Sequence, residues 1–355
     1  LANEAAYGKR VIPSYHFDKA KAIVSLSADF LGTWLNPVEF AKQYAVGKRI
    51  DEKNPAMSKH IHFETVASMT GSNADEKYLC RPSEIGAVAL GLLNAVKGAE
   101  ITGIIDAKLK AGIEAAAKAL IANKGAALVV AGSNDVNVQI LVNAINDAIG
   151  ANGTTVNFGV TVNYRQGIDS DFAALLEEMN AGKVNVVLFH GANPVYTWPN
   201  ADKVKAALAK VKTTVSFSGK LDETTATCKY VIPDHHFLES WGDAEAATGY
   251  VSFIQPTIAP LFKTRAFADS LLKWSGDATD YTSFVKNYWS AKLGGENNWN
   301  ASLQAGVINP SLANVAGASI NSAAVATAIA AVAANKISNK IELALYQKVG
   351  IGAGQ

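Results

Sequence analysis

Two groups of histidine and acidic side chains are spaced so that each could form one site. The stretch 60–64 has the sequence His-Ile-His-Phe-Glu, so in a strand its three polar side chains would share one face. A second group, His235, His236 and Glu239, precedes a tryptophan. Imidazole and carboxylate groups bind zinc, but neither spacing matches a specific ligand motif. Because histidines near strand ends more often form local hydrogen bonds, we expect no metal site in either group.

Cysteine chemistry and the common nucleotide motifs give no stronger signal. The chain has only two cysteines, Cys80 and Cys228, far apart in sequence, so no Cys-x-x-Cys pair can hold zinc or an iron–sulfur cluster. Neither is flanked by a histidine that would activate it, and we expect both to be structural. No dinucleotide fingerprint, P-loop or nucleophile elbow occurs. We therefore predict no catalytic residue in this chain.

A possible phosphate contact follows an apolar run at 184–189. There the chain continues as Gly191-Ala-Asn193-Pro. Ligands of parallel sheets lie beyond the carboxyl ends of the strands, where glycine permits close approach of the backbone. A single glycine after a strand is also ordinary turn geometry, so both interpretations stay open.

Three short apolar runs, each followed by a small-residue loop and a helix-like pattern, must position these residues. The runs are 22–27, 127–131 and 184–189. Continuous apolar strands alternating with amphipathic helices are typical of a parallel sheet covered by helices, so the predicted class is α/β. Helices are predicted at Pro37–Tyr44, Ser83–Val96, Asp106–Asn123, Asn137–Ile149, Asp171–Asn180 and Ala201–Lys210.

Length and charge limit the remaining possibilities. The chain has 355 residues, 49% of them hydrophobic, which is enough for two lobes. Lys and Arg number 32 against 31 Asp and Glu, so nucleic acid is an unexpected partner. We place a lobe boundary near the Gly-, Asn- and Thr-rich stretch 154–167.

The two ends of the chain give further expectations. The Ala-rich stretch 314–336 is expected to form a soluble helix and Ile341–Tyr346 a last strand. The start at Leu1 without a leader and the glycine-rich run 349–355 suggest an internal piece of a longer chain.

Motifs in the second half of the chain carry a family resemblance. The stretches VVLFHGANPVYTWPN (186–200) and LDETTATCKYVIPDHHFLESWGD (221–243) resemble the molybdopterin oxidoreductase family. The earlier stretch DKAKAIVSLSADFLGTW (18–34) resembles the same family's strand and Gly-x-Asn-Pro loop, with Ser27 and Asp29 in place of glycine and asparagine. That exchange removes a close-approach glycine and adds negative charge where a phosphate would lie.

Within this family, nearly the whole chain is most similar to the molybdopterin-like part of the fused iron–sulfur subunit of bacterial alternative complex III, a quinol-oxidising membrane complex. The resemblance rests on LANEAAYGKRVIPSYHF, HFETVASMTGSNADEKYLCRPSE, VIPDHHFLESWGDAEAATGY, IQPTIAPLFKTR and IELALYQKVGIGAG. It implies two Rossmann-like three-layer α/β units with mainly parallel sheets. Residues 1–155 would be an inserted Rossmann-like domain, 156–290 the returning half of a second α/β domain, and 291–355 an Ala-rich helix and terminal strand leading to an absent C-terminal domain.

The resemblance also implies a function. The chain would be a non-catalytic scaffold without a molybdenum cofactor, with iron–sulfur clusters elsewhere in the full-length polypeptide. Gly191, Asn193 and Asp222 would line a vestigial pterin-nucleotide cleft, and the bulky Trp34 and Trp198 would fill it or pack at a lobe interface. The implied partners are the iron–sulfur domain of the same chain, a quinol-binding membrane subunit and other subunits of a respiratory complex on the periplasmic side of the bacterial inner membrane.

Two other functions stay open. The chain could be the central portion of an active molybdopterin-dependent reductase of the polysulfide reductase type. In that case a guanine nucleotide would lie near Gly191, Asn193 and Asp222. Alternatively, it could be a small-molecule binding module without redox chemistry.

Overall fold

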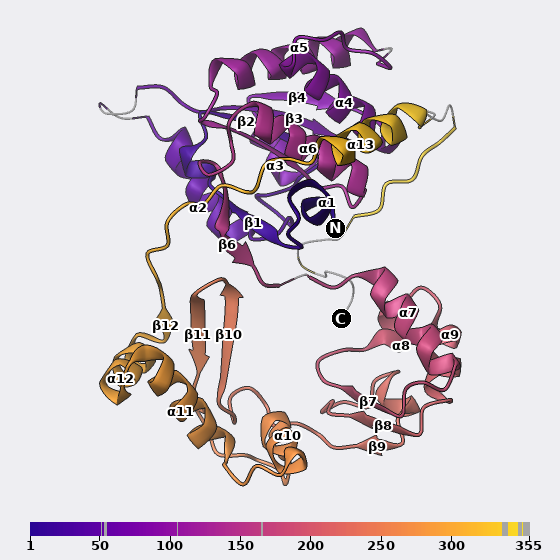
Figure 1. Ribbon diagram of the computed structural model, residues 1–355, viewed down its shortest axis with the longest axis vertical. Helices are drawn as coiled ribbons and strands as arrows, with labels where there is room; N and C mark the ends of the chain where they lie inside the picture. The colour runs from indigo at the N-terminus through magenta and orange to yellow at the C-terminus, as the bar shows by residue number, and fades with distance from the viewer. Residues whose placement is uncertain are drawn as a thin grey trace. The chain divides into compact units, whose positions relative to one another are not determined.

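A computed structural model describes residues 1–50, 52, 55–104, 106–164, 166–335, 340–346 and 350. The glycine-rich run 349–355 lies outside the described residues except for Gly350. The chain forms two compact units, drawn in Figure 1. The first unit comprises Leu1–Asn163 with Ser311–Gln355, and the second comprises Tyr164–Pro310. Each contains a parallel sheet with helices, so the predicted α/β class is confirmed.

The first unit is built on a parallel sheet of order β4-β3-β2-β5. Strand β2 (Ala22–Leu26) pairs with β3 (Lys59–Glu64) on one side and β5 (Ala127–Ala131) on the other. Every residue of β2 and β5 is buried, as expected for strands covered on both faces. Strand β4 (Glu76–Leu79) pairs with β3 and forms one edge of the sheet. The carboxyl ends of β2, β3 and β5 therefore meet at one border of the sheet.

Amphipathic helices supply the core around this sheet. Helices α4 (Ile85–Val96), α5 (Ala107–Ala122) and α6 (Val136–Ala148) bury Leu92, Ile113 and Leu141 completely. Asp106 caps α5 and Asp135 caps α6 by accepting hydrogen bonds from first-turn N–H groups. The unit also contains α1 (Ala2–Tyr7), η1 (Phe17–Lys19), α2 (Pro37–Lys48), α3 (Met69–Ser72) and η2 (Pro82–Glu84).

The compact units differ from the predicted ranges 1–155, 156–290 and 291–355, which stay a prediction about the family's domains. Strand β6 (Val156–Val162) pairs antiparallel with β1 (Ile12–Tyr15), and this pairing keeps 156–163 in the first unit. The boundary between the two units, at Asn163 and Tyr164, falls inside the stretch 154–167, where a lobe boundary is predicted. Half of that stretch is strand β6, whose Val156, Phe158, Val160 and Val162 are buried.

The C-terminal part of the described chain returns to the first unit. Helix α13 (Ser322–Ala334) packs on α4 and α6 through Val325, Ala328 and Val332. This is the predicted Ala-rich helix, shorter than the stretch 314–336. The strand predicted at Ile341–Tyr346 is absent: these residues are irregular, and four of their apolar side chains are exposed. Glu342 instead accepts hydrogen bonds from the N–H and hydroxyl of Ser83.

The second unit contains a smaller parallel sheet of order β7-β8-β9. Its strands are β7 (Val186–Phe189), β8 (Thr213–Ser216) and β9 (Tyr230–Val231). Helices α7 (Asp169–Asn180) and α9 (Ala201–Leu208) contribute Leu176, Met179 and Val204 to its core. The short α8 (Pro194–Thr197) and η3 (Thr225–Thr227) lie between these elements in sequence.

The remaining strands of the second unit are antiparallel and add to the mainly parallel sheets that are predicted. Strands β10 (Gly242–Ala247) and β11 (Tyr250–Ile254) form a hairpin, and β12 (Val307–Ile308) pairs with β11. Phe253 packs between the indoles of Trp289 and Trp299, which lie on α11 (Tyr281–Leu293) and α12 (Glu296–Ala305). Helix α10 (Phe267–Ser275) precedes them.

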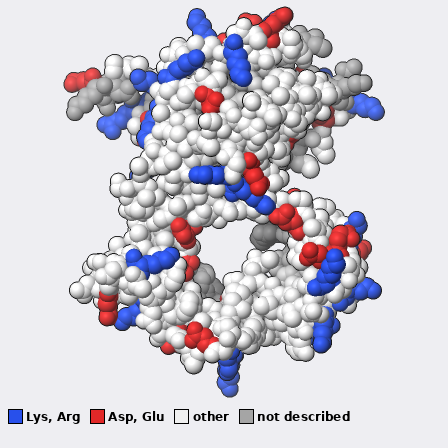
Figure 2. Space-filling model, in the orientation of Figure 1, with Lys and Arg blue, Asp and Glu red and all other residues white. Residues whose placement is uncertain are grey.

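Surface charge is mixed, in line with a net charge of +1. Figure 2 shows Lys and Arg interspersed with Asp and Glu over the visible face of the molecule. Within the described ranges, no helix combines the length and the apolar character needed to cross a membrane.

Candidate functional site

The first candidate position is the loop Ser27–Leu31, which leaves the carboxyl end of β2. Ser27 has a left-handed backbone with φ of 51°, and its N–H donates to the carbonyl of Phe63 at 2.7 Å. The Asp29 carboxylate accepts a hydrogen bond from the N–H of Thr70 at 3.0 Å. The Thr70 hydroxyl in turn accepts one from the N–H of Leu31 at 2.9 Å. These bonds tie the loop to the first turn of α3.

The loop Gly191–Val195, at the carboxyl end of β7, repeats two of these hydrogen bonds, those that join the Asp29 position and the Leu31 position to a threonine. Gly191 is left-handed with φ of 63°. The Asn193 side-chain oxygen accepts hydrogen bonds from the N–H of Thr224 at 3.2 Å and from its hydroxyl at 2.7 Å. The Thr224 hydroxyl oxygen also accepts a bond from the N–H of Val195 at 3.0 Å.

The two loops therefore share one arrangement of residues and hydrogen bonds. In both, a left-handed residue is followed two positions later by Asp or Asn, whose oxygen accepts from a buried threonine N–H. The residue two positions further on donates its own N–H to that threonine's hydroxyl. The side chain at the Asp29 and Asn193 positions thus fixes the loop. The difference between the loops is the negative charge of Asp29.

Acidic side chains and backbone fill the space that glycines open at the border of the first sheet. A Cβ atom added to Gly32 would lie 2.1 Å from an Asp29 carboxylate oxygen. One added to Gly71 would lie 2.3 Å from a Glu64 oxygen, and one at Gly132 would lie 2.2 Å from the carbonyl oxygen of Ser27. The close approach that glycine permits is used here by the chain itself.

The structure brings the predicted residues Gly191, Asn193 and Asp222 to one border of the second sheet. Asn193 has both ends of its side-chain amide engaged, since its nitrogen also donates to Glu223 at 2.8 Å. Asp222 accepts a hydrogen bond from the N–H of Thr225 at 2.7 Å. Only Gly191 faces open space: a Cβ there would have no atom within 4 Å.

Hydrogen bonds also set the charge state of Asp222. Burial alone would raise the pKa of this carboxyl, but bonds from Thr225 and Ser218 outweigh it and hold the pKa below its ordinary value. Asp222 is therefore ionised at neutral pH and engaged within its own loop. A negative charge at this border does not favour a phosphate.

His190 and Asp234 form a polar pair that the sequence analysis missed. The His190 Nε2 and an Asp234 oxygen are 2.8 Å apart, and the imidazole stacks on Phe267 with ring centroids 4.1 Å apart. The other Asp234 oxygen accepts from the N–H of Phe267 at 2.7 Å. His190 directly follows β7, and that position was the available signal. The pair joins the ends of β7 and β9 to the start of α10.

The two histidine groups are used in hydrogen bonding. His60, His62 and Glu64 share a buried face of β3, as the alternation predicts. The Glu239 carboxylate accepts from the N–H groups of His236 and Leu261. Among the described residues, no cluster of three or more His, Cys, Asp or Glu side chains is arranged to hold a metal ion.

Neither cysteine is an activated nucleophile. Both are free thiols. Burial raises the pKa of Cys80 to about 12 and also raises that of Cys228. Since the thiolate is the reactive form, a raised pKa disfavours nucleophilic chemistry at both side chains.

The two tryptophans next to the loops pack inside their own units. The Trp34 indole lies 5.3 Å from the ring of Tyr15 and 5.7 Å from that of Phe40, measured between centroids. Trp198 lies 4.8 Å from Phe172 on α7. Both contacts are ordinary aromatic packing.

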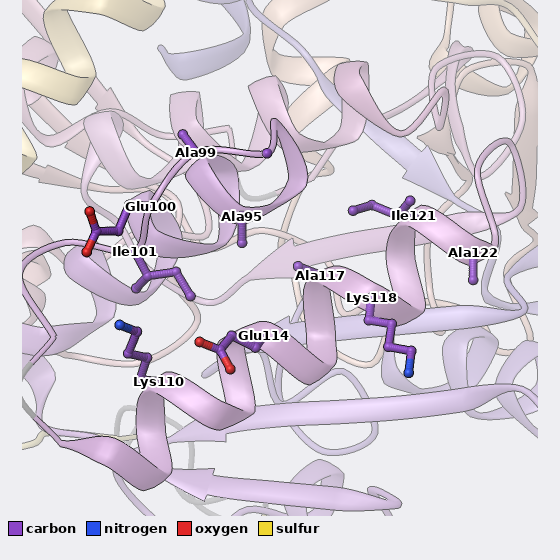
Figure 3. A pocket seen from close by; sticks show the side chains of 11 residues that line it. Ala95, Ala99, Glu100, Ile101, Lys110, Glu114, Ala117, Lys118, Ile121 and Ala122 are labelled. Carbon is purple, nitrogen blue, oxygen red and sulfur yellow. The ribbon is translucent and has the colours of Figure 1, made fainter.

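An open groove of about 640 Å³ lies between α4 and α5. Figure 3 shows small side chains such as Ala95 and Ala117 along it, with Glu100, Lys110 and Glu114 beside them. None of its lining residues belongs to the two loops, so it is not the predicted cleft.

Comparison with known proteins identifies the family. The model of the molybdopterin oxidoreductase family matches residues 47–268, more than half of the chain. The chain belongs to the molybdopterin oxidoreductase family. The match includes the Gly191–Val195 loop, and the resemblance inferred from the sequence is confirmed.

Two relatives put this family membership in context. The chain is 25% identical over 307 residues to the menaquinone reductase, molybdopterin-binding-like subunit of Nitratidesulfovibrio vulgaris, covering 74% of this chain and 44% of that protein. Acetylene hydratase from Pelobacter acetylenicus has a similar fold, with a TM-score of 0.54 at 14% identity over 84% of this chain and 50% of that one. The chain thus spans about half the length of these relatives.

The described residues do not fit the phosphate-bearing cofactor that the family name implies. At the first border, the N–H of Thr70 is bound by a carboxylate of the chain itself. At the second, the Asn193 side-chain oxygen is bound by Thr224, and Asp222 is bound by Thr225. A phosphate would have to displace these bonds and approach carboxylates at both borders.

Proposed function

We propose that this chain is a non-catalytic, molybdopterin-oxidoreductase-like scaffold in a membrane-associated respiratory complex. Its role is to hold iron–sulfur and quinone-binding partners in place for electron transfer. The complex we have in mind is a quinol-oxidising alternative complex III. No residue of this chain takes part in a chemical step in this proposal.

One observation carries the proposal: the Asp29 carboxylate bound to the N–H of Thr70. In the matched second loop, the same hydrogen bond is accepted by the neutral Asn193. A loop that only needed an acceptor could use asparagine in both places. The carboxylate adds a charge that repels phosphate, and Glu64 brings another carboxylate against Gly71 at the same border.

The proposed respiratory setting is supported by the name of one relative. That relative is a molybdopterin-binding-like subunit of a menaquinone reductase. We propose by analogy that this chain works beside a quinol-binding membrane subunit, and that iron–sulfur clusters lie in another region of its full-length polypeptide. We place it on the periplasmic side of the bacterial inner membrane.

Metal and pterin analysis of the full-length subunit, purified with its complex, tests the scaffold proposal. We expect iron but no stoichiometric molybdenum or tungsten, and no fluorescent pterin after oxidative release. Stoichiometric molybdenum together with pterin would show that the chain belongs to a working cofactor enzyme.

A second function, an active molybdopterin-dependent reductase, is favoured by the second loop. Gly191 leaves open space beside its backbone, and the His190–Asp234 pair lies next to it. This function requires a guanine nucleotide to bind there. Thermal unfolding with GDP and GTP separates the two proposals: a scaffold should show no shift, and a nucleotide site should show a concentration-dependent rise. A rise without any molybdenum in the complex would instead favour a small-molecule binding module.

A further inference from the structure

A continuous chain of polar side chains runs through the interior of the first unit. The Tyr44 hydroxyl lies 3.2 Å from Nδ1 of His60, and Nε2 of His60 lies 2.8 Å from the Ser25 hydroxyl. That hydroxyl also contacts Nδ1 of His62, whose Nε2 is 3.1 Å from a Glu64 oxygen. Strand β2 supplies the serine, β3 supplies both histidines and the glutamate, and α2 supplies the tyrosine.

The chain is shut off from solvent. Ser25, His60 and His62 have no exposed surface, and Glu64 is 1% exposed. The hydrogen-bond donors and acceptors of these side chains must therefore find their partners within the protein, since a buried polar group without a partner is costly. The donors and acceptors along this chain can be counted from one end to the other.

Charged groups lie at both ends of the chain. Lys77 on β4 lies 3.5 Å from the second Glu64 oxygen. Asp29 lies near His62, and its carboxylate is bound to the N–H of Thr70. At the other end, Asp75 accepts from the N–H of His60 and pairs with Lys48 at 2.6 Å.

One direction of hydrogen bonding satisfies every contact along the chain with neutral histidines and an ionised Glu64. In it, Tyr44 donates to Nδ1 of His60, His60 donates from Nε2 to Ser25, and Ser25 donates to Nδ1 of His62. His62 then donates from Nε2 to the Glu64 carboxylate. Each histidine carries its proton on Nε2. The Glu64 oxygen next to His62 also accepts hydrogen bonds from the N–H and hydroxyl of Ser68, whereas the other oxygen has no hydrogen-bond partner in the described structure and lies beside Lys77.

The opposite direction requires one more proton. Tyr44 also lies 2.9 Å from the carbonyl oxygen of Asn73, and its single hydrogen can point there instead. The oxygen of Tyr44 then accepts from Nδ1 of His60, Nε2 of His60 accepts from Ser25, and Ser25 accepts from Nδ1 of His62. Nε2 of His62 and the Glu64 oxygen now face each other, so one additional proton must lie between them.

We propose that Tyr44, His60, Ser25, His62 and Glu64 form a proton-binding chain that takes up one proton between His62 and Glu64 and reverses all its hydrogen bonds together. Proton uptake at one end changes the tautomer of His60, a residue that does not bind the added proton. The site and its ligand, a single proton, lie beyond the scaffold function and do not depend on it.

At neutral pH the proton-poor direction is the resting state. Burial lowers the pKa of His60 to about 3 and also lowers that of His62, so both rings are neutral. Burial and the nearby Asp75 raise the pKa of Tyr44, so its phenol keeps its hydrogen. The resting state predicts two Nε2–H tautomers.

Nitrogen-15 NMR of the histidine rings across a pH titration of the full chain tests this proposal. We expect His60 and His62 to carry Nε2–H at neutral pH, and the His60 proton to move to Nδ1 in the same pH step that protonates the His62–Glu64 pair. Exposed His236, which lies outside this chain of side chains, is the internal control. A His60 tautomer that stays fixed, or changes in a different pH step, would overturn the proposal.

Two variants separate coupling from coincidence. In Ser25→Ala the link between the rings is removed, so the His60 tautomer should no longer follow proton uptake at His62. In Glu64→Gln the proton acceptor is removed, so no concerted step should remain. A Ser25→Ala protein in which the two rings still change together would contradict the chain. The wild-type titration decides the proposal even if a variant fails to fold.

Discussion

At the scale of single residues, Asp29 and Asn193 show how one hydrogen bond can be kept while the charge of the acceptor side chain changes. Each oxygen accepts from a buried threonine N–H, Thr70 in one loop and Thr224 in the other. The sequence alone shows that Asp29 stands where the family pattern has asparagine. It does not show the threonines, because each lies about 30 to 40 positions further along the chain and is brought there by the strand pairing.

Replacing Asp29 by alanine should destabilise the first unit. The variant leaves the N–H of Thr70 without its partner at the start of α3, a loss that usually costs about 1–2 kcal/mol. Asp29→Asn should lose less, because the acceptor oxygen stays. Urea unfolding followed by circular dichroism measures both, with the exposed acid Glu114 changed to Gln as the charge control. Equal stability of Asp29→Ala and the control would contradict this role.

Acid should weaken the first unit through His60. Burial lowers the pKa of His60 from 6.5 to about 3, so the unfolded chain binds the proton more readily than the folded one. Stability from this residue is intact above about pH 6.5 and falls as the pH drops toward 3, by up to about 1.4 kcal/mol per pH unit.

Urea unfolding at a series of pH values measures this slope. His60→Gln should flatten it, whereas His236→Gln, which changes an exposed histidine, should leave it as in the wild type. If both variants keep the wild-type slope, His60 is not the group responsible.

At the scale of elements, local pattern was sufficient for strands β2, β5 and β7 and for helices α2, α4, α5, α6, α7 and α9, but not for the one-turn helix α8. Their continuous apolar runs and periodic faces are properties of neighbouring residues. The alternating burial of β6 was present in the sequence, but its Gly, Asn and Thr content hid it. The error at Ile341–Tyr346 has a different cause: an apolar alternation favours a strand, but a strand also needs a neighbour to pair with.

The docking of α13 offers a direct test at this scale. Ala328 is completely buried where α13 faces α4 and α6, whereas Ala330 is exposed. Ala328→Glu should cost about 2–4 kcal/mol, because it buries a carboxylate or detaches the helix. Ala330→Glu should be within about 0.5 kcal/mol of the wild type. Thermal unfolding measures the stability of both variants, and limited proteolysis measures how readily the segment that follows residue 310 is cleaved. Similar behaviour of the two variants would rule out this packing.

At the scale of the whole molecule, the two units differ in how much apolar surface they bury. The first unit has one large core that includes α13, whereas the described residues of the second form two smaller clusters. Sequence composition predicted enough apolar residues for two lobes but not their unequal distribution, which depends on how segments distant in sequence pack together.

Hydrogen exchange should reflect this difference. Amides of β2, β3 and β5 lie in buried parallel strands, whereas most residues of β10 are exposed. We expect exchange in β10 to be at least about tenfold faster, which corresponds to about 1.4 kcal/mol of opening free energy. Mass spectrometry of deuterated peptides measures it, and uniform protection of all four strands would contradict the expectation.

The two loops Ser27–Leu31 and Gly191–Val195 can be compared directly within one molecule. Each begins with a left-handed residue, and the loops share two corresponding hydrogen bonds, once with an acid and once with an amide as the acceptor. Changing Asp29 to asparagine or Asn193 to aspartate alters the charge of the acceptor while an acceptor oxygen stays in place, so each loop serves as the comparison for the other.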